Sequence, residues 1–273
     1  MADMKQYKYM AARRLTQAAV LFLFIAGNAY GWKVLRGNLS SARLLDTVPL
    51  SDPFAVLQSY AAGASVAVDA VIGGIIILLF YAVLGGRVFC GWVCPVNMVT
   101  DLANRTRRLL KFDKVWQSWA VKRKVRYWAA ALSIVLSAIL GVAAFEWISP
   151  IGMLHRGIIY GMGLGWTFVG AVFLFDLFAV KNGFCGHLCP LGGFYSLVGR
   201  FGFLRIAYDK GNCTLCMKCT DICPEKQVLH MVGTQSGPVL SGECINCGRC
   251  VEVCDDDALH FSSIYSRKFI NKG

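Results

Sequence analysis

Apolar residues gather in four long runs within the first 180 residues of this 273-residue chain, and polar or basic stretches separate them. The runs cover residues 15–32, 64–84, 125–148 and 158–180. Each approaches or exceeds the roughly 20 residues that an α-helix needs to cross the hydrocarbon of a bilayer. A soluble fold of this size cannot hide four such runs, so the pattern predicts four transmembrane helices.

The first run needs a separate check because Arg13 and Arg14 precede it. Paired arginines before an apolar stretch also occur in secretory signals of the twin-arginine type. No small-x-small cleavage site follows the run, and the residues after the arginines fit that consensus poorly. We therefore expect an uncleaved first span, and cleavage would leave the orientation of the other three unchanged.

The distribution of lysine and arginine predicts the orientation of the spans. The N-terminal tail has four of these residues and the segment from Arg87 to Arg126 has ten, whereas the segments after the first and third runs have three and one. Positive residues stay on the cytoplasmic side, so both termini are expected in the cytoplasm of a bacterial inner membrane. The formal net charge of +12 then mostly reflects topology, and no nucleic-acid partner is expected.

Composition divides the chain into a membrane part and a small soluble part. The whole chain is 56% hydrophobic and 16% charged, while soluble proteins are nearer 45–50% and about 25%. The densest cysteine clustering follows Gly211. We predict a transmembrane domain over residues 1–206, a ferredoxin domain over 207–262 and a tail over 263–273. The expected fold class is an α-helical polytopic membrane protein with a C-terminal α+β ferredoxin domain of the bacterial 2[4Fe–4S] type.

Two cysteine runs define the C-terminal domain. Residues 213–224 have the spacing C-x2-C-x2-C-x3-C-P, and residues 244–254 repeat it with Asp255 in place of the proline. This spacing holds [4Fe–4S] clusters, with the fourth cysteine of each run bound to the other cluster. The predicted ligand sets are Cys213, Cys216, Cys219 and Cys254 for the first cluster, and Cys244, Cys247, Cys250 and Cys223 for the second. A pair of zinc sites is the alternative, although zinc has no use for four cysteines in each run.

A shorter cysteine motif, here called the cassette, occurs twice at the end of an apolar run. The first cassette, residues 89–95, reads F-C-G-W-V-C-P, and the second, residues 184–190, reads F-C-G-H-L-C-P. Its C-x3-C-P form matches the end of a ferredoxin run, and two spans precede each copy. This internal repeat predicts that Cys90, Cys94, Cys185 and Cys189 meet at the cytoplasmic face, as a third metal centre or as redox thiols. Alternatively, they are small residues that shape the span ends.

Four apolar runs, two cassettes in this order and a double ferredoxin tail resemble the NapH/MauN family of membrane ferredoxin-type proteins. The resemblance extends to the NapH-type quinol dehydrogenase membrane subunit of the periplasmic nitrate reductase system. It implies a subunit that takes electrons from quinol and passes them, with a periplasmic NapG-type iron–sulfur protein, towards periplasmic nitrate reductase. A NapC-type tetrahaem cytochrome is an additional or alternative route. The chain lacks C-x-x-C-H, so it carries no c-type haem of its own.

Other relatives imply a different role. Members that accompany methylamine dehydrogenase, nitrous oxide reductase or copper oxidases point to a membrane ferredoxin that supports assembly or maintenance of a partner's redox cofactor. Under either reading the chain is a subunit for electron transfer rather than a self-contained enzyme.

Quinol oxidation needs proton acceptors beside an apolar slot. Ionisable residues in or near spans are candidates, and the topology puts Asp69, Glu146 and His155 close to the periplasmic surface. We predict a quinol site from these three residues, with ordinary polarity at the water boundary as the alternative. Asp176, near the cytoplasmic end of the fourth run, is expected to pair with a basic residue such as Lys181.

Overall fold

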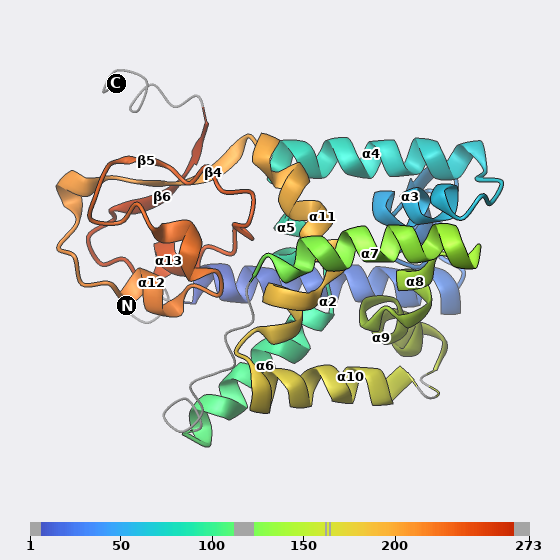
Figure 1. The fold of residues 1–273 in the computed structure, drawn as a ribbon, viewed down its shortest axis with the longest axis horizontal. Coiled ribbons are helices and arrows are strands. Elements are labelled where there is room, and N and C mark those ends of the chain that lie inside the picture. The colour runs from blue at the N-terminus through green and yellow to red at the C-terminus, as the bar shows by residue number, and fades with distance from the viewer. Residues whose placement is uncertain (1–6, 112–122, 162, 164, 265–273) are drawn as a thin grey trace. The chain divides into compact units, whose positions relative to one another are not determined.

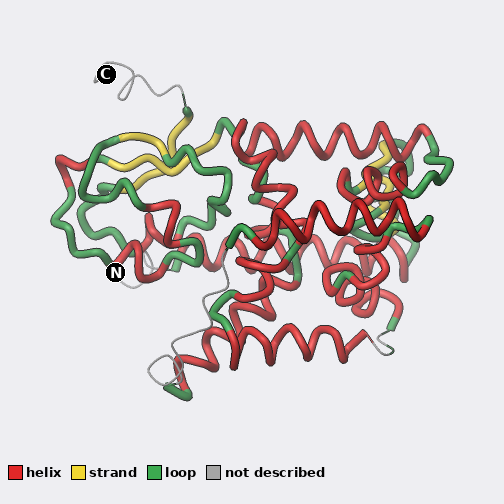
Figure 2. The backbone as a smooth tube through the Cα atoms, viewed as in Figure 1, coloured by secondary structure: helices red, strands yellow, loops and turns green. Residues whose placement is uncertain are grey.

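The computed structural model describes residues 7–111, 123–161, 163 and 165–264 (Figure 1). The described chain is mostly helical, with two three-stranded antiparallel sheets (Figure 2). Contacts divide it into two compact units. The ferredoxin unit comprises residues 1–17, 79–93 and 195–273, and the helical unit comprises 18–78 and 94–194.

The helical unit begins within a long helix that runs directly into a small sheet. Its first elements are α2 (Lys8–Ala29), β1 (Leu35–Gly37), β2 (Ser41–Leu44), β3 (Val48–Ser51), α3 (Pro53–Ala61) and α4 (Val68–Leu84). Strand β2 is central and pairs with β1 and β3. Asp52 caps α3 by accepting hydrogen bonds from the amides of Phe54 and Ala55, and Pro53 fits the first helical position. The pattern of apolar runs does not predict this sheet.

Shorter helices complete the helical unit. They are α6 (Val96–Leu109), α7 (Val125–Leu140), α8 (Ala144–Ile148), α9 (Pro150–Tyr160), α10 (Gly165–Leu174), two π-helical turns (Phe175–Ala179 and Phe184–Leu188) and the start of α11 (Pro190–Val198). Helix α3 packs against α7, and α10 packs against α6 and α9.

The helices differ in how much of each predicted apolar run they cover. Among the described residues, α2 alone is long and apolar enough to cross a membrane, and Val68–Leu84, Val125–Leu140 and Gly165–Ala179 are shorter apolar helices. The third run is broken because Gly141 ends α7 with a left-handed φ of 68°. The start of the fourth run belongs to α9, which ends at Gly161.

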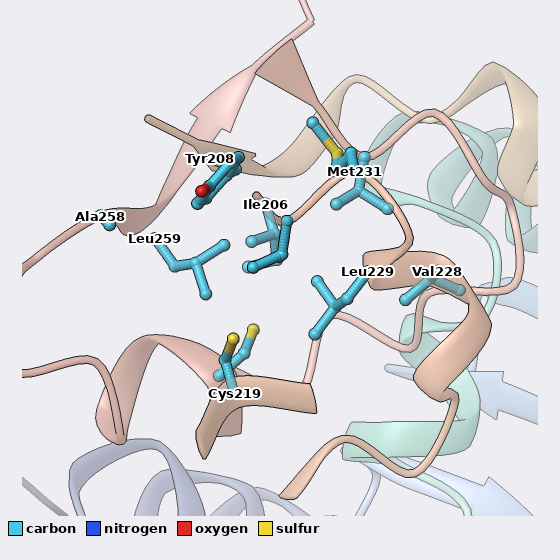
Figure 3. Packing of buried hydrophobic residues seen from close by; sticks show 11 residues of the cluster. Ile206, Tyr208, Cys219, Val228, Leu229, Met231, Ala258 and Leu259 are labelled. Atoms are coloured by element: carbon cyan, nitrogen blue, oxygen red, sulfur yellow. The ribbon is translucent and has the colours of Figure 1, made fainter. Parts of the chain in front are cut away.

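The ferredoxin unit is built around strand β4. It contains α5 (Val88–Trp92), β4 (Leu204–Tyr208), α12 (Lys218–Ile222), β5 (Gly237–Pro238), α13 (Arg249–Glu252), β6 (Leu259–Ser263) and 3-10 turns at Gly199–Phe201, Lys210–Asn212 and Lys226–Leu229. Strand β4 pairs with both β5 and β6. Ile206 and Tyr208 of β4 pack with Leu229, Leu259 and Cys219 in a buried core (Figure 3). A cysteine predicted to bind a cluster is therefore part of the hydrophobic core itself.

Residues distant in sequence join the ferredoxin unit. The backbone amide of Met10 donates to a carboxylate oxygen of Glu252 at 2.9 Å, and the amide of Tyr9 donates to the same oxygen. The rings of Tyr9 and Phe261 lie 5.1 Å apart. The compact unit thus takes in residues from before the predicted boundary at 206/207, although β4 begins close to that boundary. Most of the predicted tail, residues 265–273, lies outside the described residues.

Candidate functional site

The first predicted ligand set gathers at one place in the ferredoxin unit. Burial raises the pKa of Cys219, and the nearby thiols of Cys254, Cys213 and Cys216 raise it further. Cys219 is buried in the core, whereas Cys216 is exposed. The structure therefore brings together the four cysteines predicted for the first cluster and leaves one edge of the set open to solvent.

The second predicted ligand set surrounds a cavity. Its walls include Cys223, Cys244, Cys247 and Cys250, together with the buried side chain of Glu225. Cys223 comes from the first run and the other three come from the second run, as the exchange of the fourth cysteine requires. The ligand assignments stay predictions, but both sets of four are gathered as expected.

The chemistry of these thiols suits a metal cluster. Burial raises the pKa of Cys244 to about 12 and that of Cys250 well above its ordinary value. Four thiolates gathered this closely repel one another, so an iron–sulfur cluster would supply the positive charge that holds them deprotonated. Among the described residues, no group of three or more His, Cys, Asp or Glu side chains is arranged around a single metal ion. Cysteine thiolates in sets of four are the usual ligands of a [4Fe–4S] cluster.

The two runs share a backbone conformation. The second and fourth residues after the first cysteine have left-handed φ values: 59° at Leu215 and 57° at Met217, then 46° at Asn246 and 74° at Gly248. Such turns point successive amides towards an anionic centre, and the Leu215 amide donates to the Cys213 sulfur at 3.4 Å. The repeat seen in the sequence is therefore also a repeat of conformation.

The first cassette packs on the second cysteine run. The Trp92 indole donates to the carbonyl of Asn246 at 3.0 Å, and the Asn246 amide donates to the carbonyls of Leu84 and Leu204 at 3.3 and 3.0 Å. A Cβ atom on Gly91 would lie 2.8 Å from the carbonyl oxygen of Ile245. The glycine of the cassette is thus needed for close approach to the cluster-binding loop.

Arg87, three residues before Cys90, was missed by the sequence analysis. Its guanidinium Nη1 lies 2.6 Å from Glu225 Oε1 and donates to the carbonyl of Glu243 at 2.9 Å. Its position close to a cysteine motif could have pointed to this role. In the sequence it counts only among the positive residues that predict the orientation of the spans. The structure places it beside the second ligand set.

The second cassette lies in the helical unit. The Cys185 sulfur is 3.4 Å from the Thr100 hydroxyl, and the Gly192 amide donates to the Cys189 sulfur at 3.4 Å. Burial raises the pKa of Cys185 well above its ordinary value, and the charges of Asp176, Cys94 and Cys189 raise it further. Three cassette cysteines are thus neighbours within this unit. Cys90 belongs to the ferredoxin unit, so the predicted four-cysteine site stays a prediction.

Each cassette ends where a helix starts. Helix α6 follows Pro95, and α11 begins at Pro190. Proline is well placed at a helix start because it needs no amide partner there. Cys94 and Cys189 therefore lie at helix N-termini, where the helix dipole favours a thiolate.

A buried arginine holds each cassette. Arg13 Nε donates to the carbonyl of Gly91 at 2.8 Å within the ferredoxin unit, and Arg126 Nη1 donates to the carbonyl of Gly186 at 3.3 Å within the helical unit. The two glycines occupy the same cassette position, and the arginines lie near the starts of α2 and α7. The internal repeat therefore includes these arginines as well as the cysteines.

The three residues predicted for a quinol site all belong to the helical unit but have different surroundings. Asp69 forms an exposed ion pair with Arg43 of β2 at 2.9 Å. Glu146 accepts a hydrogen bond from the Ser40 hydroxyl at 2.5 Å and lies 3.7 Å from Arg156. Both carboxylates thus interact with residues of the sheet region. Among the described residues, neither is seen to bond to His155.

His155 stands out because its side chain is 1% exposed and neither ring nitrogen has a hydrogen-bond partner among the described residues. Its ring meets Phe24 edge to face at 4.6 Å. Burial lowers the pKa of His155 to about 4, and the charge of Arg156 lowers it further. A neutral imidazole with two unused nitrogens in apolar surroundings can hydrogen-bond a ligand and accept its proton.

Asp176 lies on the π-helical turn Phe175–Ala179 and is fully buried. Its carboxylate accepts a hydrogen bond from the amide of Phe184 at 2.9 Å, at the start of the second cassette. Arg107 of α6 interacts with the same carboxylate by charge. The expected basic neighbour is thus provided by Arg107, and Asp176 helps to fix the cassette.

Comparisons with known proteins identify iron–sulfur families over much of the chain. A family described as a 4Fe-4S binding domain matches residues 66–113 and 162–207, and one described as a 4Fe-4S dicluster domain matches 205–255. The ferredoxin-type protein NapH of Escherichia coli is 42% identical over 96% of this chain and 92% of its own. The methylamine utilization ferredoxin-type protein MauN of Methylorubrum extorquens is 43% identical over 92% of this chain and 88% of its own. No solved structure matches.

Proposed function

Because the chain belongs to the NapH/MauN family of ferredoxin-type proteins, we propose that it is a membrane subunit that oxidises quinol. Electrons pass through two [4Fe–4S] clusters and a periplasmic iron–sulfur partner of the NapG type towards periplasmic nitrate reductase, with a NapC-type cytochrome as an additional or alternative route. The observation that carries the electron-transfer part is the gathering of eight cysteines into two sets of four. Such paired clusters relay single electrons.

Exposed apolar helix faces support the placement in a membrane. Leu79 and Val83 of α4, Trp128 and Ile139 of α7, and Trp166 of α10 each have more than half of their surface exposed. A soluble monomer rarely leaves such large apolar surfaces open to water, whereas lipid would cover them. We propose that these shorter helices cross the membrane together with α2, in a four-span topology with both termini in the cytoplasm.

His155 supports quinol as the electron donor. Quinol gives up two protons with its two electrons, so its site needs a neutral base that is shielded from water. The buried imidazole of His155, next to Phe24, has this character. We assign it the proton-accepting role, with Glu146 as a second acceptor held near Arg156. Asp69 is the weakest of the three predicted residues because its carboxylate is exposed and paired.

The test is reduction of the clusters by a quinol analogue in liposomes that contain the full, cluster-loaded chain. Bleaching of the iron–sulfur absorbance reports the rate, first alone and then with the periplasmic iron–sulfur partner. We expect His155→Leu to slow quinol-driven bleaching at least tenfold while dithionite still reduces the clusters. Asp69→Asn serves as the matched control and should stay within about twofold. Absence of quinol-driven bleaching in the unmodified protein, with and without the partner, would overturn the proposal.

A second function is favoured by the 43% identity to a methylamine utilization protein. Here the chain would supply electrons for assembly or maintenance of a partner's redox cofactor, as in the methylamine dehydrogenase, nitrous oxide reductase or copper-oxidase systems. Depleting the chain after the partner enzyme has been matured, and then measuring the partner's activity, distinguishes the two functions. An electron-transfer subunit is needed at every turnover, whereas a maturation factor becomes dispensable once the partner enzyme has been matured.

The cassettes are proposed as a third metal site or as redox thiols. Support comes from the family match, since both ranges of the 4Fe-4S binding domain include a cassette. Serine at Cys94 or Cys189 should then lower the iron content or change the number of reducible thiols. Unchanged iron content, thiol count and electron transfer would leave the cassettes as structural turns.

A further inference from the structure

Arg87 lies beside Cys90 of the first cassette and beside the second ligand set, all within the ferredoxin unit. It is 1% exposed, and its ion pair with Glu225 is buried on both sides. Glu225 lies two residues after Cys223 and lines the cavity of the second set. The guanidinium therefore neutralises a carboxylate that faces the cluster cavity.

The same guanidinium also contacts the chain next to Cys244, another cysteine of this ligand set. It donates to the carbonyl of Glu243, the residue before Cys244. Gln227 joins the two acidic residues, because its amide donates to Glu225 at 2.7 Å and to Glu243 at 2.6 Å. Arg87 thus fixes the chain on both sides of the cavity, next to Cys223 and next to Cys244.

Arg87 also interacts with the first cassette. Its side chain hydrogen-bonds to Cys90 and interacts with that thiol by charge, and its charge also acts on Cys244. Charges interact strongly at buried sites because water screens them poorly. One buried cation therefore interacts with both a cassette cysteine and a predicted cluster ligand.

We propose that Arg87 is a positioning residue that couples the first cassette to the cluster held by Cys223, Cys244, Cys247 and Cys250. The reduction potential of this cluster then depends on the charge at position 90. A change of charge at the cassette, whatever redox or metal chemistry causes it, alters the ease with which the neighbouring cluster accepts an electron. The inference rests on the proposed electron-transfer function only in requiring loaded clusters, and it does not depend on quinol or nitrate reductase.

The repeat provides a comparison within the molecule. Asn182 occupies the position of Arg87 in the second cassette, three residues before Cys185, and its amide oxygen accepts a hydrogen bond from Asn104 at 2.6 Å. Because asparagine is neutral, Asn182 cannot influence a cluster through its charge. Coupling through a buried arginine is thus specific to the first cassette.

The test is a redox titration of the detergent-solubilised, cluster-loaded full chain, followed by electron paramagnetic resonance. A Cys216→Ala background removes the first cluster so that the remaining signal belongs to the second. We expect Arg87→Gln to shift the midpoint of this signal to lower potential, since reduction adds a negative charge that the arginine stabilises. Glu225→Gln should shift it to higher potential, and Asn182→Ala should leave it unchanged.

A second pair of variants avoids removing the buried arginine. Cys90→Asp and Cys90→Asn are nearly equal in size and both lack the thiol, so they differ in charge alone. The aspartate variant should titrate at lower potential than the asparagine variant. In a background that retains only the first cluster, through Cys247→Ala, the two should coincide. Equal midpoints for the second cluster would overturn the coupling, and so would an equal shift of both clusters, whatever the quinol experiment shows.

Discussion

Arg87 and His155 are both buried side chains with several nitrogen atoms, but they differ in their hydrogen-bond partners. Arg87, in the ferredoxin unit, is held by Glu225, the carbonyl of Glu243 and Cys90. His155, in the helical unit, has no hydrogen-bond partner for either ring nitrogen among the described residues. Since buried polar groups are almost always satisfied, the first is part of the folded framework, and the second has the capacity to bind the ligand proposed above.

The difference predicts opposite effects of apolar substitution. Removing one member of a buried ion pair leaves the other charge without compensation, which destabilises the fold. Removing a polar group that has no partner relieves a desolvation penalty. Stability and function are therefore expected to change together at Arg87 and in opposite directions at His155.

The largest expected effect is that of Arg87→Met. Glu225 would keep its charge in a buried place, so we expect a loss of about 3–5 kcal/mol in the free energy of unfolding. Denaturant unfolding of the solubilised protein, followed by tryptophan fluorescence, measures it. Arg36→Met is the matched control because Arg36 forms an exposed ion pair with Asp46 at 3.4 Å. Exposed pairs contribute less than about 1 kcal/mol, so equal losses would contradict the difference proposed between the two sites.

The second effect is acid sensitivity from His155. Its folded-state pKa of about 4 is below the unfolded value of 6.5, so the unfolded chain binds more protons between these two pH values. Stability therefore falls as the pH drops through this window. Between pH 7 and pH 5 we expect a loss of about 2 kcal/mol from this residue, measured as the change in unfolding free energy.

His155→Leu should remove this pH-dependent loss and raise stability at pH 5, even though it should slow the proposed quinol oxidation. His230→Leu is the control because His230 is exposed and bonded to the carbonyl of Gln227. An exposed imidazole has no desolvation penalty to relieve, so this replacement should not stabilise the protein. If His155→Leu were instead destabilising at pH 5, the imidazole would have a structural partner and the ligand interpretation would fail.

The sequence predicted which cysteines gather far better than it predicted the residues that surround them. Cysteine spacing is local, so the exchange of Cys223 and Cys254 between two sets followed from the motif alone. The role of Arg87 depends on contacts with residues more than 130 positions away, which no local pattern reveals. The sheet β1–β3 was missed because its strands have three or four residues and Pro49 interrupts their signal.

The apolar runs show the same limit in another way. Hydropathy located α2 and α4 well, but it merged α7 with α8 because Gly141 and the residues after it are also apolar or small. The end of a helix at a left-handed glycine is a conformational event that hydropathy does not register. Likewise, burial of His155 could be guessed from its position, but its lack of partners could not.

The third effect tests how closely the first cassette must approach the second cysteine run. In Gly91→Ala the new Cβ would lie 2.8 Å from the carbonyl oxygen of Ile245, a backbone atom that cannot rotate away. We expect a loss of about 1–3 kcal/mol and a changed signal of the second cluster. Gly170→Ala in α10 is the control, because nothing lies within 4 Å of its added Cβ. A neutral Gly91→Ala would mean that Arg87 acts without a tightly packed cassette.

The smallest effect concerns backbone strain at Met217 in the first cysteine run. Met217 is 46% exposed and has a φ of 57°, whereas Gly248 takes the equivalent place in the second run. A left-handed φ costs an L-residue about 1–2 kcal/mol, and glycine's greater freedom in the unfolded chain offsets part of the gain. Met217→Gly should therefore stabilise the protein by up to about 1 kcal/mol, whereas Met217→Ala, which keeps the strain, should not. If both variants had the same effect, side-chain exposure and not backbone conformation would distinguish the first run from the second.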